Sequence, residues 1–296
     1  MNKIIVIVGP TASGKTKLSI ELAHKYDAVI INADSTQIYK EPLIATAKIK
    51  EEEKEGIEHY LFDIVSLNEN YTLYDYQKDG RKLINKLINE NKNIIIVGGS
   101  GLYIKALLYD YNLEENENIK IDFSDYSNYE LKKLADSINA NNNIHINNRQ
   151  RLERYVTYYK QTGKIIEKTD NRNNRIYNFI MIGLNAERNL LYEKINDRVD
   201  RMFENGLIIE AKKLYNMNLK NFSNIIGYKE LKMYFEEKIS LEDAKELIKR
   251  NSRRYAKRQY TWFNNQMKDI KWFDVDYNNF DKTIFNLCLF INKIEE

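Results

Sequence analysis

The stretch GPTASGKT at residues 9–16 constrains the fold more than any other part of the chain. It fits the pattern G-x-x-x-x-G-K-[S/T] through Gly9, Gly14, Lys15 and Thr16, and it lies between the apolar run IIVIV and the helix-like KLSIELAHKY. In such a strand–loop–helix unit, backbone N–H groups face an anion, the lysine adds positive charge, and the hydroxyl is offered to Mg²⁺. The loop is typical of nucleotide-binding proteins, ATP-binding ones included, and predicts a diphosphate site. A purely structural glycine turn is the alternative.

Short apolar runs rich in β-branched residues predict a parallel sheet. They occur at 3–8, 28–33, 93–97 and 175–184, with a further candidate at KWFDV (271–275), and helical segments separate the first three. Between residues 111 and 174 such runs stop, and ELKKLADSI and RQRLERYVTYYKQTG have helical patterns. We therefore expect an α/β fold, a P-loop-type parallel sheet wound with helices. Residues 1–112 and 176–296 would form the catalytic core with a helical C-terminal part, and residues 113–175 a small helical insertion domain.

Composition excludes several classes of protein. The net charge of +3 is too small to indicate a nucleic-acid partner, so the distribution of charge has to decide that point. The single cysteine, Cys288, lies in an apolar run and excludes both internal disulfides and a cysteine zinc cluster. No apolar stretch approaches the ~20 residues of a membrane span, and no cleavable signal pattern is visible. We expect a cytoplasmic protein without a membrane partner.

A kinase or hydrolase with such a loop usually has a second carboxylate at the end of an apolar strand, where it helps to hold Mg²⁺. The run IIIV ends in Gly98, Gly99 and Ser100, whereas Asp34 follows the second strand-like run. Ligands of wound parallel sheets bind at the carboxyl ends of the strands, so Asp34 and the phosphate loop should share one crevice. Capping of a following turn is the other interpretation of Asp34. Ser35 and Gln37 add hydrogen-bonding groups suited to a planar heterocycle.

Two clusters of cations indicate a polyanionic partner. A helical projection of the segment 241–263 places Arg250, Arg253, Arg254 and Lys257 on one arc, opposite an apolar face. Gln259 lies within that apolar face, where a buried amide needs a partner or costs about 1–3 kcal/mol. Arg149, Arg151 and Arg154 form the second cluster, at the start of the helix in the insertion. A solvated helix face is the alternative for the first arc.

Nine stretches along the chain resemble one family, the tRNA dimethylallyltransferases, in its bacterial form. They are GPTASGKT (9–16), DSTQIYK (34–40), TAK (46–48), VGGSGLYIKALL (97–108), IHINNRQRLER (144–154), TGK (162–164), INDRVDRMFENGL (195–207), IIGYKEL (225–231) and YAKRQYTWF (255–263). The phosphate loop alone is not specific, but this combination in this order is.

The resemblance implies transfer of the allyl group of dimethylallyl diphosphate to N6 of adenosine 37 in the anticodon stem-loop of tRNA, with Mg²⁺ assisting. It implies Asp34 as general base, and Lys15, Arg198 and Ser100 as further catalytic residues. The implied diphosphate ligands are Gly9, Thr11, Ala12, Ser13, Gly14, Lys15, Thr16 and Arg198, with Thr16 on the metal. The implied tRNA contacts are Asp34, Ser35, Thr36, Gln37, Ser100, Arg149, Gln150, Arg151, Arg154, Arg253, Arg254, Lys257, Arg258 and Gln259. We expect a monomer.

Some positions depart from the family pattern. Ser100 replaces the common Thr, Tyr60 replaces a second His after His59, and Asn148 replaces Asp; Leu43 and Ala45 stand where D-I-G usually precedes TAK. These changes bear on the contacts with tRNA more than on the reaction, because the loop, Asp34 and Arg198 are intact. Two other hypotheses stay open: a kinase that uses the loop on ATP, and a non-catalytic RNA-binding protein that uses a nucleotide as a switch.

Overall fold

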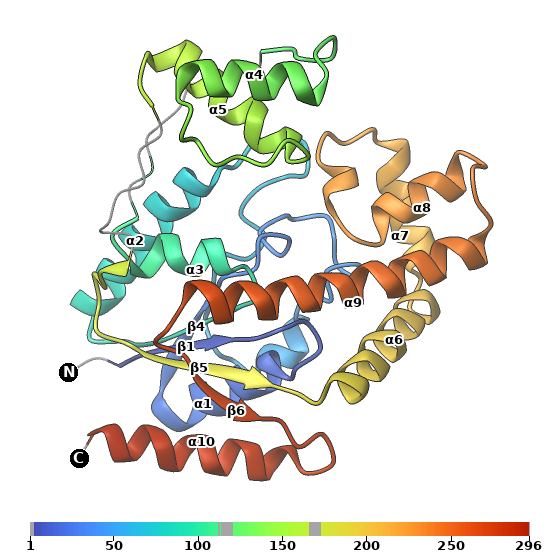
Figure 1. Cartoon of the computed structure of the whole chain (residues 1–296). Coiled ribbons are helices and arrows are strands. Elements are labelled where there is room, and N and C mark those ends of the chain that lie inside the picture. Colours follow the sequence, from blue (N-terminus) through green and yellow to red (C-terminus); the bar gives the residue numbers. More distant parts are fainter. Residues whose placement is uncertain (1–2, 112, 114–120, 166–172, 296) are drawn as a thin grey trace. The chain divides into compact units, whose positions relative to one another are not determined.

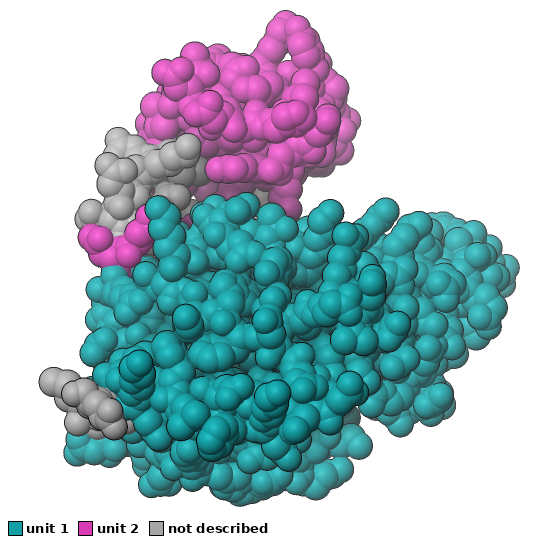
Figure 2. Space-filling model, turned by 60° about the horizontal axis from the view of Figure 1, so that its bottom comes forward, with its two compact units in different colours: residues 1–109, 175–296 teal, residues 110–174 magenta. Residues whose placement is uncertain are grey.

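The computed structural model describes residues 3–111, 113, 121–165 and 173–295 (Figure 1). The chain divides into two compact units: unit 1 comprises residues 1–109 and 175–296, and unit 2 comprises residues 110–174. Figure 2 colours the two units separately. Residue 112, the expected end of the first core segment, lies outside the described residues.

Unit 1 contains a six-stranded parallel sheet in the order β3-β2-β4-β1-β5-β6, which confirms the predicted α/β class. The strands are β1 (Ile4–Val8), β2 (Ala28–Asn32), β3 (His59–Tyr60), β4 (Asn93–Gly98), β5 (Ile180–Asn185) and β6 (Lys271–Asp274). The expected strand at 175–184 was wrong in its first half, since Arg175 makes only an isolated bridge to Tyr109. The two-residue β3 is too short to give a periodic signal and was not predicted.

Helices cover both faces of this sheet (Figure 1). On one face, α2 (Leu73–Asn89), α3 (Gly101–Leu108) and α9 (Leu241–Gln266) pack against Ile4, Val6 and Val8 of β1. On the other, α1 (Lys15–Tyr26) and α10 (Phe280–Glu295) pack against Ile5 and Ile7. Successive strand residues point to opposite faces, so a strand buried on both sides is apolar throughout. This explains the continuous run IIVIV.

A separate helical cluster extends unit 1 beyond the sheet. It contains α6 (Arg188–Glu204), α7 (Leu207–Asn216), α8 (Tyr228–Phe235) and the first half of α9, packed around Leu207, Tyr228 and Ile248. Single 3₁₀ turns occur at Glu51–Lys54 and Phe222–Asn224. This cluster brings α6 and α7 to the carboxyl end of the sheet.

Unit 2 has a small core of its own between α4 (Asn128–Ile138) and α5 (Arg149–Thr162), centred on Leu131 and Leu152. Asn148 caps α5, because its side chain accepts a hydrogen bond from the backbone N–H of Arg151. Among the described residues, none of the helices is both long and apolar enough to cross a membrane.

Candidate active site

The phosphate loop joins β1 to α1 and has the conformation of an anion cradle. Ala12 (φ 64°) and Gly14 (φ 89°) both lie in the left-handed region, which turns consecutive backbone N–H groups toward one side. Ser13 is fully buried and its Oγ donates to the carbonyl of Pro10 at 2.8 Å. Lys15 Nζ donates to the same carbonyl at 2.6 Å. The loop is thus braced internally and ends at the N-terminus of α1, where an anion is favoured.

Two partly buried cations, Lys15 and Arg198, meet at this loop. Burial lowers the pKa of Lys15 from its ordinary 10.5 to about 8; the charge of Asp34 opposes the shift, and that of Arg198 adds to it. Burial also lowers the pKa of Arg198, on α6, although a guanidinium stays charged at neutral pH. One carboxylate against two cations leaves excess positive charge in a poorly solvated space. Such a space favours a multiply charged anion.

Asp34 follows β2 and is held by its own turn. Its Oδ1 accepts hydrogen bonds from the backbone N–H of Thr36 at 2.9 Å and from Thr36 Oγ1 at 2.7 Å. The backbone N–H of Asp34 donates to Asn32 Oδ1 at 2.9 Å, and Asn32 also bonds the carbonyl of Leu61. Capping therefore uses one carboxylate oxygen, while Oδ2 has no hydrogen bond to the described residues. The second oxygen is available to accept a proton.

Ser100 and Gln259 connect the turns after three strands. Ser100 Oγ accepts from the backbone N–H of Ser35 at 2.9 Å and donates to Ser35 Oγ at 3.1 Å. Gln259 Oε1 accepts from the backbone N–H of Thr11 at 2.9 Å, and its Nε2 donates to the carbonyl of Gly99 at 3.0 Å. The amide predicted to need a partner has two, both in the backbone. Gln259 thereby ties the phosphate loop to the turn after β4.

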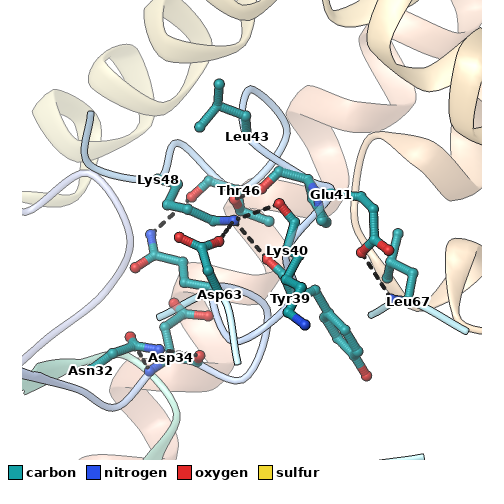
Figure 3. A network of polar contacts seen from close by, with 12 residues as sticks. Asn32, Asp34, Tyr39, Lys40, Glu41, Leu43, Thr46, Lys48, Asp63 and Leu67 are labelled. Atoms are coloured by element: carbon teal, nitrogen blue, oxygen red, sulfur yellow. Dashed lines mark hydrogen bonds and ion pairs between the residues drawn. The ribbon is translucent and has the colours of Figure 1, made fainter. Parts of the chain in front are cut away.

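The turn at residues 41–48 lies beside Asp34 and orients two site residues (Figure 3). The carbonyl of Thr46 accepts from Gln37 Nε2 at 3.0 Å and from Arg198 Nη2 at 3.3 Å. Lys48, buried below this turn, donates to the carbonyl of Tyr39 at 2.6 Å and to Asp63 Oδ1. The positions of Arg198 and Gln37 therefore depend on the conformation of this turn.

Glu210, on α7, holds the outer side of the same turn and was missed by sequence analysis. Its two carboxylate oxygens accept from the backbone N–H groups of Leu43, Ile44 and Ala45 at 3.0, 2.8 and 3.1 Å. The Tyr228 hydroxyl also donates to Glu210 at 2.6 Å. These contacts use backbone N–H groups at 43 and 45, so they do not depend on the side chains that depart from the family pattern. Glutamate on a helix face carries no sequence signal for such a role.

The phosphate loop, Asp34, Arg198 and Gln259 line one cavity of about 290 Å³. Its polar lining includes the loop from Thr11 to Thr16, with Asp34, Gln37, Lys194, Arg198, Arg201 and Gln259, and its apolar lining includes Ile30, Ala47, Ile49, Phe62 and Val97. His59 also lines the cavity, and its Nδ1 donates to the carbonyl of Ile57 at 2.8 Å. Burial lowers the pKa of His59, which favours the neutral form of its ring. The lining thus combines charged and apolar side chains.

The basic arc on α9 is only partly as predicted. Arg250, Arg254, Lys257 and Arg258 are exposed. Arg253 is half-buried, and its Nη1 donates to Asn196 Oδ1 of α6 at 2.5 Å, so it joins two helices instead of lying free on the arc. The projection gives the direction of a side chain but not the neighbouring helix that receives it.

In the basic cluster of unit 2, one arginine is engaged within the protein and the others are exposed. Arg149 donates to the carbonyls of Tyr126 and Phe123 at 2.7 and 2.6 Å and pairs with Glu153 at 2.7 Å, so its guanidinium fixes the start of α5. The other two members, Arg151 and Arg154, are exposed, and so is the neighbouring Gln150.

Comparison with known proteins gives consistent results. The family model of IPP transferases matches residues 37–266. A curated tRNA dimethylallyltransferase of Anoxybacillus flavithermus is 44% identical over 293 residues, covering 96% of this chain and 92% of the relative, and that of Bacillus subtilis is 42% identical, covering 92% and 90%.

Solved structures agree with this match. The crystal structure of a tRNA isopentenylpyrophosphate transferase from Bacillus halodurans superposes with a TM-score of 0.75 at 38% identity, covering 99% of this chain and 96% of the other. A eukaryotic dimethylallyltransferase acting on tRNA superposes with a TM-score of 0.83 at 27% identity, covering 98% and 78%.

The parallel sheet, with helices on both faces, defines an α/β protein that has a cavity beside the loop after β1. Within that class, the chain belongs to the IPP transferase family and is a prenyltransferase.

Proposed function

We propose that this protein transfers the dimethylallyl group of dimethylallyl diphosphate to N6 of adenosine 37 in tRNA and releases diphosphate. The observation that carries the proposal is the meeting of Lys15, Arg198 and Asp34 at one cavity that apolar side chains also line. A diphosphate needs the cations, an amine acceptor needs the carboxylate, and a five-carbon allyl group suits the apolar side.

The diphosphate is assigned to the phosphate loop. Lys15, Arg198 and the loop N–H groups face charge that grows on the leaving oxygen as the allylic carbon–oxygen bond breaks, so they stabilise the transition state more than the ground state. The two cations are already fixed, by Pro10 and by Thr46 respectively. Little reorganisation is therefore needed at the moment of reaction.

Magnesium is compatible with these residues. The described part of the chain holds no group of three or more metal-binding side chains, so the protein has no cage of its own there. Mg²⁺ commonly keeps several waters and binds through substrate phosphates and few protein oxygens, a role that the exposed Thr16 hydroxyl fits. Bound there, it would neutralise charge on the leaving diphosphate.

Asp34 is assigned as the base. The lone pair of N6 forms the new bond to the allylic carbon, the carbon–oxygen bond breaks, and the N6 proton passes to the carboxylate. Oδ1 is occupied by Thr36, which orients the group and leaves Oδ2 for this proton. General-base catalysis of this kind is typically worth about 10²–10⁴-fold.

The tRNA is assigned to the mouth of this cavity and to the exposed cations. Ser35, Thr36, Gln37 and Ser100 offer polar groups beside Asp34 for a base that has left its stack. Phosphate contacts with the anticodon stem-loop fall to Arg254, Lys257 and Arg258 in unit 1 and to Arg151 and Arg154 in unit 2. We propose that the protein acts as a monomer in the cytoplasm.

The test is incubation of the protein with tRNA and radiolabelled dimethylallyl diphosphate, with and without Mg²⁺. Label should enter tRNA, and Asp34→Asn should slow its entry by about two to four orders of magnitude while diphosphate still binds. Turnover of ATP in the absence of tRNA would instead favour the kinase hypothesis.

A further inference from the structure

The chain just before and at the start of α10 packs against the phosphate loop. The Tyr277 hydroxyl donates to the carbonyl of Ala12 at 3.0 Å. The Phe280 ring lies so close to Gly14 that a Cβ at Gly14 would be 2.5 Å from its Cε2. Both contacts fall on loop residues with φ in the left-handed region, Ala12 and Gly14.

Ala12 is the more demanding of these positions. A non-glycine residue in the left-handed region persists only where its surroundings hold it there. The peptide bond between Ala12 and Ser13 is trans and planar, so the N–H of Ser13 points opposite to the carbonyl that Tyr277 holds. Ser13 lines the cavity. The hydrogen bond to Ala12 therefore fixes the direction of a neighbouring N–H group in the cradle.

We infer that Tyr277 is a positioning residue for the diphosphate, which acts through the carbonyl of Ala12 and never touches the ligand. The inference rests on the proposed use of the loop for diphosphate. It adds a residue beyond the family match, which ends at residue 266. Burial raises the pKa of Tyr277 to about 12, so the hydroxyl stays a donor at neutral pH. A loop held in this way before binding loses less entropy when the anion arrives.

The test compares two tyrosines of unit 1 whose hydroxyls each donate a hydrogen bond between distant parts of the chain. Tyr277→Phe removes one hydroxyl and leaves the ring. Tyr26→Phe is the control, because the Tyr26 hydroxyl joins α1 to α10, through Asn292 Oδ1 at 3.1 Å, and lies at the end of α1 that is opposite to the phosphate loop. Titration calorimetry with inorganic diphosphate gives Kd separately from the number of competent sites, so partial unfolding would lower the stoichiometry and leave Kd unchanged.

We expect Tyr277→Phe to raise the Kd of diphosphate and the KM of dimethylallyl diphosphate about three- to tenfold, the range for one lost hydrogen bond. The Kd of tRNA should not change, and Tyr26→Phe should bind diphosphate normally.

An equal rise in the Kd of diphosphate in Tyr26→Phe would overturn the inference, because it would show that weaker packing of α10 in general, and not the hydrogen bond to Ala12, lowers the affinity. If diphosphate binds Tyr277→Phe normally but is lost in Lys15→Ala, only the role of Tyr277 is overturned. If Lys15→Ala also binds diphosphate normally, the proposed function of the loop is overturned with it.

Discussion

Lys15→Met should stabilise the protein while abolishing its binding of diphosphate. Lys15 has a pKa of about 8 in the folded protein against 10.5 ordinarily, because burial disfavours the charged form. Between these two values the unfolded state binds more protons than the native state, so stability rises with pH. The free-energy cost of keeping Lys15 charged in the folded protein is absent above its unfolded-state pKa of 10.5. This cost is complete below its folded-state pKa of about 8.

The pKa difference corresponds to about 3 kcal/mol at pH 7, since one factor of ten is worth about 1.4 kcal/mol. Methionine removes this penalty but also loses the hydrogen bond to the carbonyl of Pro10, worth about 1 kcal/mol. The variant should therefore gain about 2 kcal/mol at pH 7. At pH 9.5 most of the unfolded-state lysines but few of the native ones are charged, so the advantage should shrink by about 2 kcal/mol.

The assay is urea unfolding of both proteins at pH 7 and pH 9.5, followed by tryptophan fluorescence. Both tryptophans, Trp262 and Trp272, lie in unit 1 together with the loop. Taking the difference between variant and wild type cancels the other groups that titrate in this range. A difference in unfolding free energy that is the same at both pH values would refute the assignment of a buried, destabilised cation.

Three further outcomes follow from the site. Asp34→Asn should keep diphosphate affinity and lower turnover by about two to four orders of magnitude, measured in single-turnover reactions; near-normal turnover would exclude it as the base. Arg254→Ala and Lys257→Ala should each reduce the slope of log tRNA affinity against log salt by about 1 at unchanged saturated rate, and an unchanged slope would make the arc a solvated face. Glu210→Ala should raise the KM of dimethylallyl diphosphate several-fold, because the turn that holds the Arg198 guanidinium loses three backbone contacts, whereas Glu204→Ala on the neighbouring helix should not.

The sequence by itself determined the parallel sheet, the phosphate loop and the place of Asp34 beside it. The sheet and the loop can be predicted from short stretches of sequence. Strands that are buried on both faces are continuously apolar, and the residues of the loop have a fixed spacing between a strand and a helix. In a parallel sheet the carboxyl ends of the strands share one edge, so residues that follow them converge without further information. The same local patterns gave the helices of unit 2 their approximate positions.

Only the tertiary structure decided which side chains are free and which are already bound. Gln259 reaches Thr11 and Gly99 across 248 and 160 positions of sequence, and Glu210 reaches the turn at 43–45 in a comparable way. Arg253 was expected on an open arc, yet it is bonded to another helix. The physical reason is that periodicity fixes the direction of a side chain on its own element, whereas its partner depends on how elements distant in sequence pack together.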